Sequence, residues 1–234
     1  IPQLNENDQE LISLLILGFV FVVIRDHRRV WSNSQSQSEA NANLILAERL
    51  IGDHIRLAGY QIQPEVVLAS LTPPIYSGMD ANNLPYLTVR FQGANDDSLQ
   101  SCLGRAVPID KISINRFYLR LNKQNNKNQN IYDLYCAEAL INVMDVVASN
   151  IEPQSLTGGN TQPIIGGILN LAFQFTEHTD DQNTLLWKTH QLVQNWQHIE
   201  HIKLIWHTQG DSHHVQNYAE LKSENIITVR NLFE

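Results

Sequence analysis

The chain has 234 residues, of which 43% are hydrophobic, so it can bury one sizeable core and carry an extension. Its formal net charge is −8, with 16 basic against 24 acidic side chains. Nucleic-acid phosphates are bound by basic surfaces, and no cluster of lysine and arginine with interleaved aromatic residues follows residue 30. The acidic net charge therefore argues against nucleic acid as a partner bound through a basic patch.

The N-terminal part contains an apolar run of 14 residues, 11–24, without a charge. As a helix this run is about 21 Å long, against a hydrocarbon core of roughly 30 Å, so by length alone it does not span a membrane. Acidic residues precede it in 6–10, and the charged residues 25–29 follow at once. The length fits a buried core helix, whereas charges at both ends are unusual for one. Both interpretations stay open at this point.

Residues 32–58 carry the pattern of an amphipathic helix. Apolar side chains recur at spacings of three and four, which places them in one stripe on one helix face. The stripe consists of Ala40, Leu44, Ala47, Ile51, Ile55 and Ala58. Gly59 fits a helix end. We therefore expect one continuous helix from about residue 10 to 58, whose first half protrudes and whose second half packs on the rest.

From residue 60 onward the pattern changes to short alternating segments rich in β-branched and aromatic residues, which is typical of strands. The expected strands are 86–91, 114–119, 131–135, 169–175, 201–206 and 226–230. Turn signals lie at 93–97 and 157–160, a polar loop at 122–130 and a possible short helix at 187–197. The sequence predicts an α+β fold with a mostly antiparallel sheet.

The two cysteines, Cys102 and Cys136, lie in segments that read as strand ends. Two buried thiols are the ordinary interpretation for a cytosolic protein, whereas a disulfide is favoured if this part of the chain lies outside the cytoplasm. No CxxC motif is present, so redox catalysis has no support.

Other polar clusters do not predict chemistry. Histidines gather at His198, His201, His207, His213 and His214. A three-residue spacing in a strand puts His198 and His201 on opposite faces, so surface histidines explain the cluster better than zinc does. The acidic segments 95–97 and 177–183 lack EF-hand spacing and read as polar turns. With no catalytic motif and no phosphate-binding glycine loop, we expect no enzyme, no catalytic residue, no metal and no cofactor.

The chain resembles the PilW-type minor pilins of type IV pili in an ordered set of short stretches that spans most of its length. The stretches are 10–16, 49–60, 87–93 with 102–104, 115–118 with 134–136, 162–168 and 227–231. Each stretch alone is weak evidence for this family, but the occurrence of all of them in the family's order is fairly specific.

The sequence departs from the family in two places. Asn5 and Glu6 stand where prepilins have a glycine followed by an aromatic residue or methionine, so a prepilin peptidase site is not visible, and residues 25–29 interrupt a helix that stays apolar for longer in the family.

The resemblance implies the type IV pilin fold, a long N-terminal helix packed on an antiparallel head. It divides the chain into a hydrophobic helix half at 1–31, an amphipathic helix half at 32–59 and a β-rich globular head at 60–234. It also implies that Glu10 pairs with the N-terminal amine of a neighbouring subunit, and that a removed leader carries the cytoplasmic positive charge. Since the head would then lie in an oxidising compartment, a disulfide between Cys102 and Cys136 is expected.

The function implied by the resemblance is that of a minor pilin, which helps to initiate or cap pilus assembly by helix docking and head-to-head contacts. The implied partners are other minor pilins, the major pilin and a large tip adhesin, with the inner membrane before assembly and the extracellular pilus, at its tip, afterwards. Adhesion, twitching motility and DNA uptake are the associated processes. The alternatives are a GspJ-like pseudopilin of a type II secretion system and a membrane-anchored periplasmic binding protein. The signature at 56–60 and the two cysteines favour the pilus.

Overall fold

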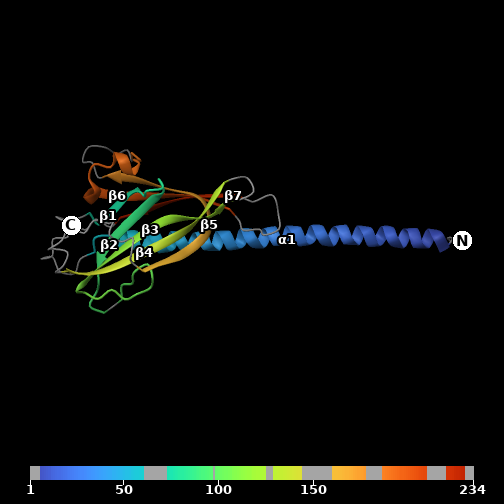
Figure 1. The fold of residues 1–234 in the computed structure, drawn as a ribbon, viewed down its shortest axis with the longest axis horizontal. Helices are drawn as coiled ribbons and strands as arrows, with labels where there is room; N and C mark the ends of the chain where they lie inside the picture. The colour runs from blue at the N-terminus through green and yellow to red at the C-terminus, as the bar shows by residue number, and fades with distance from the viewer. Residues whose placement is uncertain are drawn as a thin grey trace.

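The structure is a computed structural model that describes residues 6–60, 73–96, 98–124, 129–143, 160–177, 186–209 and 220–229. It consists of one long helix, α1 (Glu6–Leu57), followed by a β-rich head (Figure 1). The strands are β1 (Ile75–Met79), β2 (Pro85–Gln92), β3 (Lys111–Gln124), β4 (Asn130–Asn142), β5 (Asn160–Glu177), β6 (Ile199–Gln209) and β7 (Glu220–Thr228). The predicted α+β fold, a long N-terminal helix packed on an antiparallel sheet, is confirmed.

The seven strands form a single sheet in which each strand pairs with its neighbour in sequence. All six pairings are antiparallel, as expected, and the registers place core residues opposite one another, as with Phe117 and Cys136. Every predicted strand overlaps one of these strands. The sequence analysis missed β1, because Ser77 and Gly78 interrupt its five residues and both have a weak preference for strands.

The C-terminal half of α1 lies across one face of the sheet, whereas its N-terminal half extends well beyond the head (Figure 1). The predicted stripe faces the sheet: Leu44, Ala47, Ile51, Ile55 and Ala58 are buried, and Ala40 at its N-terminal end is partly exposed. They share one core with Trp206, Phe175 and other sheet residues. Burying one leucine or isoleucine contributes about 1.5–3 kcal/mol, so this stripe is the main attachment between helix and head.

The helix ends at the predicted glycine. Gly59 has a φ of 73°, a conformation that costs a residue with a side chain more than it costs glycine. Its backbone N–H donates to the carbonyl oxygen of Arg90 in β2 at 2.7 Å. The end of α1 is thus bonded directly to the sheet.

Three local predictions need correction. Residues 187–197 do not form one short helix: two 3-10 turns, η3 (His190–Leu192) and η4 (Trp196–His198), are separated by extended backbone at Val193 and Asn195. The Trp196 ring packs edge-on against Phe175 at 4.9 Å, a tertiary contact that overrides helical spacing. The strand predicted at 169–175 begins earlier, at Asn160 of β5, and Cys136 lies in the middle of β4 instead of at a strand end.

We expect Ala47→Asp to lower the free energy of unfolding by about 3–5 kcal/mol, because Ala47 is fully buried between α1 and the sheet, where a carboxylate has no partner. Leu46→Asp is the matched control: Leu46 is 57% exposed on the other side of the helix, so a change of about 1 kcal/mol or less is expected. Chemical denaturation of both variants measures the difference. Equal losses would contradict this orientation of the helix.

A chain shortened to begin at Ser32 is expected to fold, because the residues removed lie outside the core of the head. A chain that begins at Asp53 lacks Leu44, Ala47 and Ile51, three of the five buried stripe residues, and is expected to unfold. Circular dichroism and thermal unfolding distinguish the two. An unfolded chain from Ser32 would place the apolar run in the globular core.

Candidate assembly surface

The free half of α1 displays apolar side chains to solvent. All ten large apolar side chains between Leu14 and Ile24 are between 47% and 71% exposed, with Leu14 and Phe19 at 71%. The interpretation of this run as a buried core helix is therefore wrong for the isolated chain. Contiguous apolar surface of this extent marks an interaction site. We call residues 14–24 the apolar arm.

Among the helices within the described ranges, none combines the length and the apolar character that crossing a membrane requires.

A basic patch follows the apolar arm directly. Arg25, Arg28 and Arg29 lie at spacings of three and four residues and so share one face of α1, where all three are exposed. Val30 and Trp31 then resume the apolar surface at 65% and 66% exposure. Any partner that covers the arm and continues along the helix meets this patch, and a buried arginine needs a counter-charge.

Glu10, the residue predicted to act in assembly, lies in α1 four residues before the apolar arm. Its side chain falls outside the described part of the structure. Its pairing with a neighbouring subunit stays a prediction.

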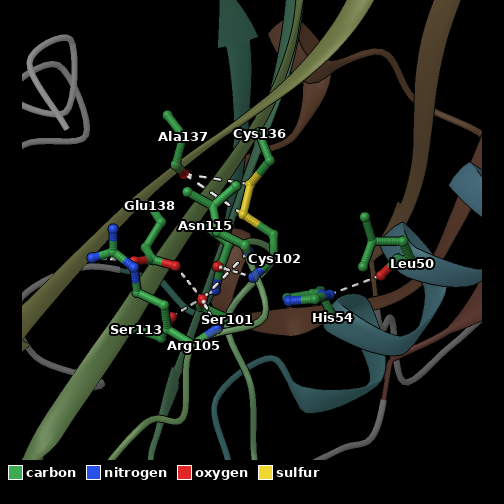
Figure 2. Close-up of a disulfide and its surroundings, with 11 residues drawn as sticks. Leu50, His54, Ser101, Cys102, Arg105, Ser113, Asn115, Cys136, Ala137 and Glu138 are labelled. Atoms are coloured by element: carbon green, nitrogen blue, oxygen red, sulfur yellow. Dashed lines mark hydrogen bonds and ion pairs between the residues drawn. A yellow bond between two sulfur atoms is a disulfide. The ribbon is translucent and has the colours of Figure 1, made fainter. Parts of the chain in front are cut away.

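At the other end of the molecule, a disulfide joins Cys102 to Cys136 (Figure 2). The Cα atoms are 6.3 Å apart, and both residues are buried in the core beneath α1. Cys102 does not lie at a strand end: it sits in a turn of the β2–β3 connection, where its backbone N–H donates to Asn115 Oδ1 at 2.8 Å. The bond ties this connection to the centre of β4. In the chain-entropy model, closing a loop of this length destabilises the unfolded chain by about 3.5–4 kcal/mol.

A buried acid holds the same connection from beside the disulfide. Glu138, on β4, is 2% exposed and accepts a hydrogen bond from Ser101 Oγ. Its other carboxylate oxygen lies 3.2 Å from Arg105 Nη1 (Figure 2). Both partners come from the β2–β3 connection, so a hydrogen bond and an ion pair join this connection to β4 in addition to the disulfide. A single strand pattern does not reveal this, because a glutamate in an alternating segment reads as solvent-facing.

His54 is a buried polar residue that the sequence analysis overlooked. It is 4% exposed, its Nδ1 lies 2.8 Å from the Leu50 carbonyl oxygen, and its ring packs edge-on against Phe117 at 5.5 Å. Burial is the largest influence on the imidazole and lowers its pKa below 6.5. The signal was present in the sequence, since His54 lies three residues after Ile51 and so falls beside the stripe.

The structure describes three of the five histidines in the cluster at residues 198–214. His198 lies in η4, His201 and His207 lie in β6, and the His201 ring is 3.2 Å from Thr228 Oγ1. His213 and His214 are outside the described residues. Across the ranges that the structure describes, no three histidine, cysteine, aspartate or glutamate side chains are grouped to hold a metal ion.

The acidic segments correspond in part to a turn. Asp96 accepts a hydrogen bond from the Ser98 backbone N–H at 3.1 Å, which is a turn contact of the expected kind. Asp97 and residues 178–183 lie outside the described ranges.

No family model matches the chain, and no curated protein matches it. Among solved structures, the chain is similar to a type IV-like pilin from Thermus thermophilus, with a TM-score of 0.48 and 9% sequence identity. The alignment covers 82% of this chain and 97% of that chain. At this score and identity the likeness carries no functional inference.

The lowered pKa of His54 predicts a stability that depends on pH. Between the folded-state pKa and the ordinary value of 6.5, the unfolded chain binds the proton and the folded chain does not. The contribution of His54 to the free energy of unfolding is therefore constant above about pH 6.5 and falls as the pH drops below it. His54→Leu should flatten the curve in this window, whereas His201→Leu, on the sheet, should keep its slope. Denaturation midpoints between pH 5 and 8 test this, and identical slopes in both variants would contradict it.

Proposed function

We propose that this chain is a minor pilin, a structural subunit that helps to initiate or cap type IV pilus assembly by docking its helix among the helices of other pilins. One observation carries the proposal: a single unbroken helix is anchored in the head by its C-terminal half and exposes a charge-free apolar arm at its free end. The ordered motifs that resemble PilW-type minor pilins support the finer assignment.

The energetics of the apolar arm fit docking. Association costs about 4–15 kcal/mol in lost freedom, and each large apolar side chain that leaves water returns about 1.5–3 kcal/mol. Ten such side chains lie between Leu14 and Ile24. Covering most of the arm therefore drives association without any contact from the head.

Within this proposal the three parts of the chain have separate tasks. Residues 1–31 enter the lipid before assembly and the filament core afterwards, residues 32–59 connect this segment to the head, and residues 60–234 contact other subunits. Glu10 pairs with the N-terminal amine of a neighbour and sets the register of addition. A carboxylate that enters an apolar bundle is costly without such a positive partner.

The head contacts other minor pilins, the major pilin and a large tip adhesin, first in the periplasm and then at the pilus tip. The Cys102–Cys136 disulfide supports this placement, because disulfides persist in oxidising compartments. The role is structural, without a catalytic residue or a cofactor.

The proposal is tested in the source organism by counting surface pili after deletion of the gene and after complementation with variants. We expect few pili in the deletion strain and partial rescue by Glu10→Ala. Phe19→Asp should fail to rescue, because it places a charge in the apolar arm, where Phe19 is 71% exposed for docking. Ser38→Asp is the matched control: it adds the same charge to an exposed polar part of α1 and should rescue fully. Immunoblots establish equal protein levels.

Normal piliation in the deletion strain and in all variants would contradict the minor pilin role. Loss of type II secretion under the same conditions would then identify the chain as a GspJ-like pseudopilin, which shares the helix arrangement. Full rescue by Phe19→Asp would contradict docking through the apolar arm, whatever the filament.

A further inference from the structure

Two arginines are buried side by side on the face of the sheet that points away from α1. Along β2, Leu87 and Val89 belong to the main core beneath the helix, and the Phe91 ring lies 5.9 Å from the His54 ring of α1, so the alternating Thr88 and Arg90 point to the opposite side. The β2–β3 register pairs Thr88 with Arg116 and Arg90 with Ile114. Arg90 and Arg116 are therefore diagonal neighbours on one face, whose Cα atoms typically lie about 7–8 Å apart. Arg90 is 4% exposed and Arg116 is 9% exposed.

The backbone of Arg90 is hydrogen-bonded on both sides, whereas its side chain has no hydrogen-bond partner among the residues that the structure describes. Its backbone N–H donates to the Pro74 carbonyl oxygen at 2.9 Å, and its carbonyl oxygen accepts from Gly59 at the end of α1. The side-chain nitrogens Nε, Nη1 and Nη2 are all buried without a hydrogen-bond acceptor. Burial is the larger cause and repulsion from Arg116 is the smaller one, and together they lower the pKa of Arg90 to about 10. The guanidinium therefore stays charged at neutral pH, and losing its proton does not relieve the cost of burial.

Arg116 is partly held and leaves a donor free in the same place. Its Nε donates to Thr88 Oγ1 at 3.3 Å, and its guanidinium carbon lies 4.6 Å from the centroid of the Tyr86 ring. Its Nη2 is buried without an acceptor. The stacking fixes the plane of the guanidinium, so the free donor has a defined direction.

No carboxylate in the described ranges compensates this charge. The acids that form ion pairs there have other partners: Asp53 lies by Arg49 and Arg56, Glu138 by Arg105, Glu177 by Lys188, and Glu224 by Lys203 and Lys222. An unpaired buried charge costs several kcal/mol, and here two like charges share one environment. Four buried guanidinium nitrogens, three of Arg90 and one of Arg116, therefore lie on the same face of the sheet without a hydrogen-bond partner among the described residues.

We propose that Arg90 and Arg116 form a binding site for a small oxyanion of the phosphate or carboxylate class. The planar guanidinium group of arginine can donate two parallel hydrogen bonds to two oxygens of such an anion. Hydrogen bonds between charged partners are roughly twice as strong as those between neutral groups. Because the Arg90 carbonyl also caps α1 through Gly59, the bound anion stabilises the junction between helix and sheet.

Thermal unfolding of the full chain in sodium phosphate tests the site, with sodium chloride at matched ionic strength as the reference. Wild type should show a saturable rise in Tm that phosphate causes and chloride does not, of about 5 °C or more at a hundredfold excess over Kd. Arg90→Met and Arg116→Met should lose the rise. Arg120→Met is the matched control, because Arg120 lies on the same strand, is exposed and stacks on Tyr135 at 5.6 Å, so it should keep the rise.

Isothermal titration of wild type with inorganic phosphate measures the binding directly and does not depend on the folding of the variants. Binding that is weakened at least tenfold in Arg90→Lys, which keeps the charge but lacks the fork, supports the site. The proposal is overturned if phosphate neither binds nor raises Tm specifically. It is equally overturned if all variants, including Arg120→Met, respond alike, or if Arg90→Met is more stable than wild type at every phosphate concentration, which is the behaviour of a merely buried charge.

Discussion

The packing of one helical stripe on one sheet determines the organisation of the whole molecule. Small residues on α1 let it approach the sheet closely: Ala47 is fully buried, and a Cβ added at Gly52 would lie 3.4 Å from the Ile227 side chain. We call this apolar contact between α1 and the sheet, formed by Leu44, Ala47, Ile51, Ile55 and Ala58, the seam. A polar contact lies beside it, since Ser223 Oγ on β7 donates to Glu48 at 2.8 Å. Because the buried side chains of the seam begin only at Leu44, the N-terminal half of α1 projects from the head. The exposure of the apolar arm is thus a direct result of where the stripe begins.

A second set of contacts joins α1 to the head at the C-terminal end of the helix. Gly59 bonds to the backbone of β2, and the β2–β3 connection folds beneath the helix end, where the Cys102–Cys136 bond and Glu138 fix it to β4. Gly93, the first residue of this connection, lies so close to the backbone of Val107 that a Cβ on it would be 2.0 Å from the Val107 carbonyl oxygen. Such a close approach excludes any side chain at this position. Hydrogen bonds and a disulfide therefore connect the end of the helix, the loop, β2 and β4 in the region around His54.

The sequence predicted what depends on periodicity and missed what depends on tertiary contact. The helix stripe and six strands were predictable because burial on one face leaves a repeating pattern. β1 was missed because a five-residue strand with Ser77 and Gly78 has too little pattern. Residues 187–197 read as a helix, but Trp196 packs on Phe175 instead. The burial of Arg90 and Glu138 was not predicted, because the pattern of a single strand does not show what covers its two faces. The disulfide followed from the resemblance, since spacing alone left both cysteine states open.

The unbroken course of α1 has a mechanical consequence. A pull on the free end of the helix reaches the head without a hinge, because no proline or other break separates residue 14 from Leu57. The seam runs along the helix axis, so such a pull loads it in shear, in which many contacts resist together instead of giving way one after another. The Cys102–Cys136 disulfide lies in the core under the C-terminal end of this seam, so the loop that it joins to β4 could not be pulled away from β4 without breaking a covalent bond.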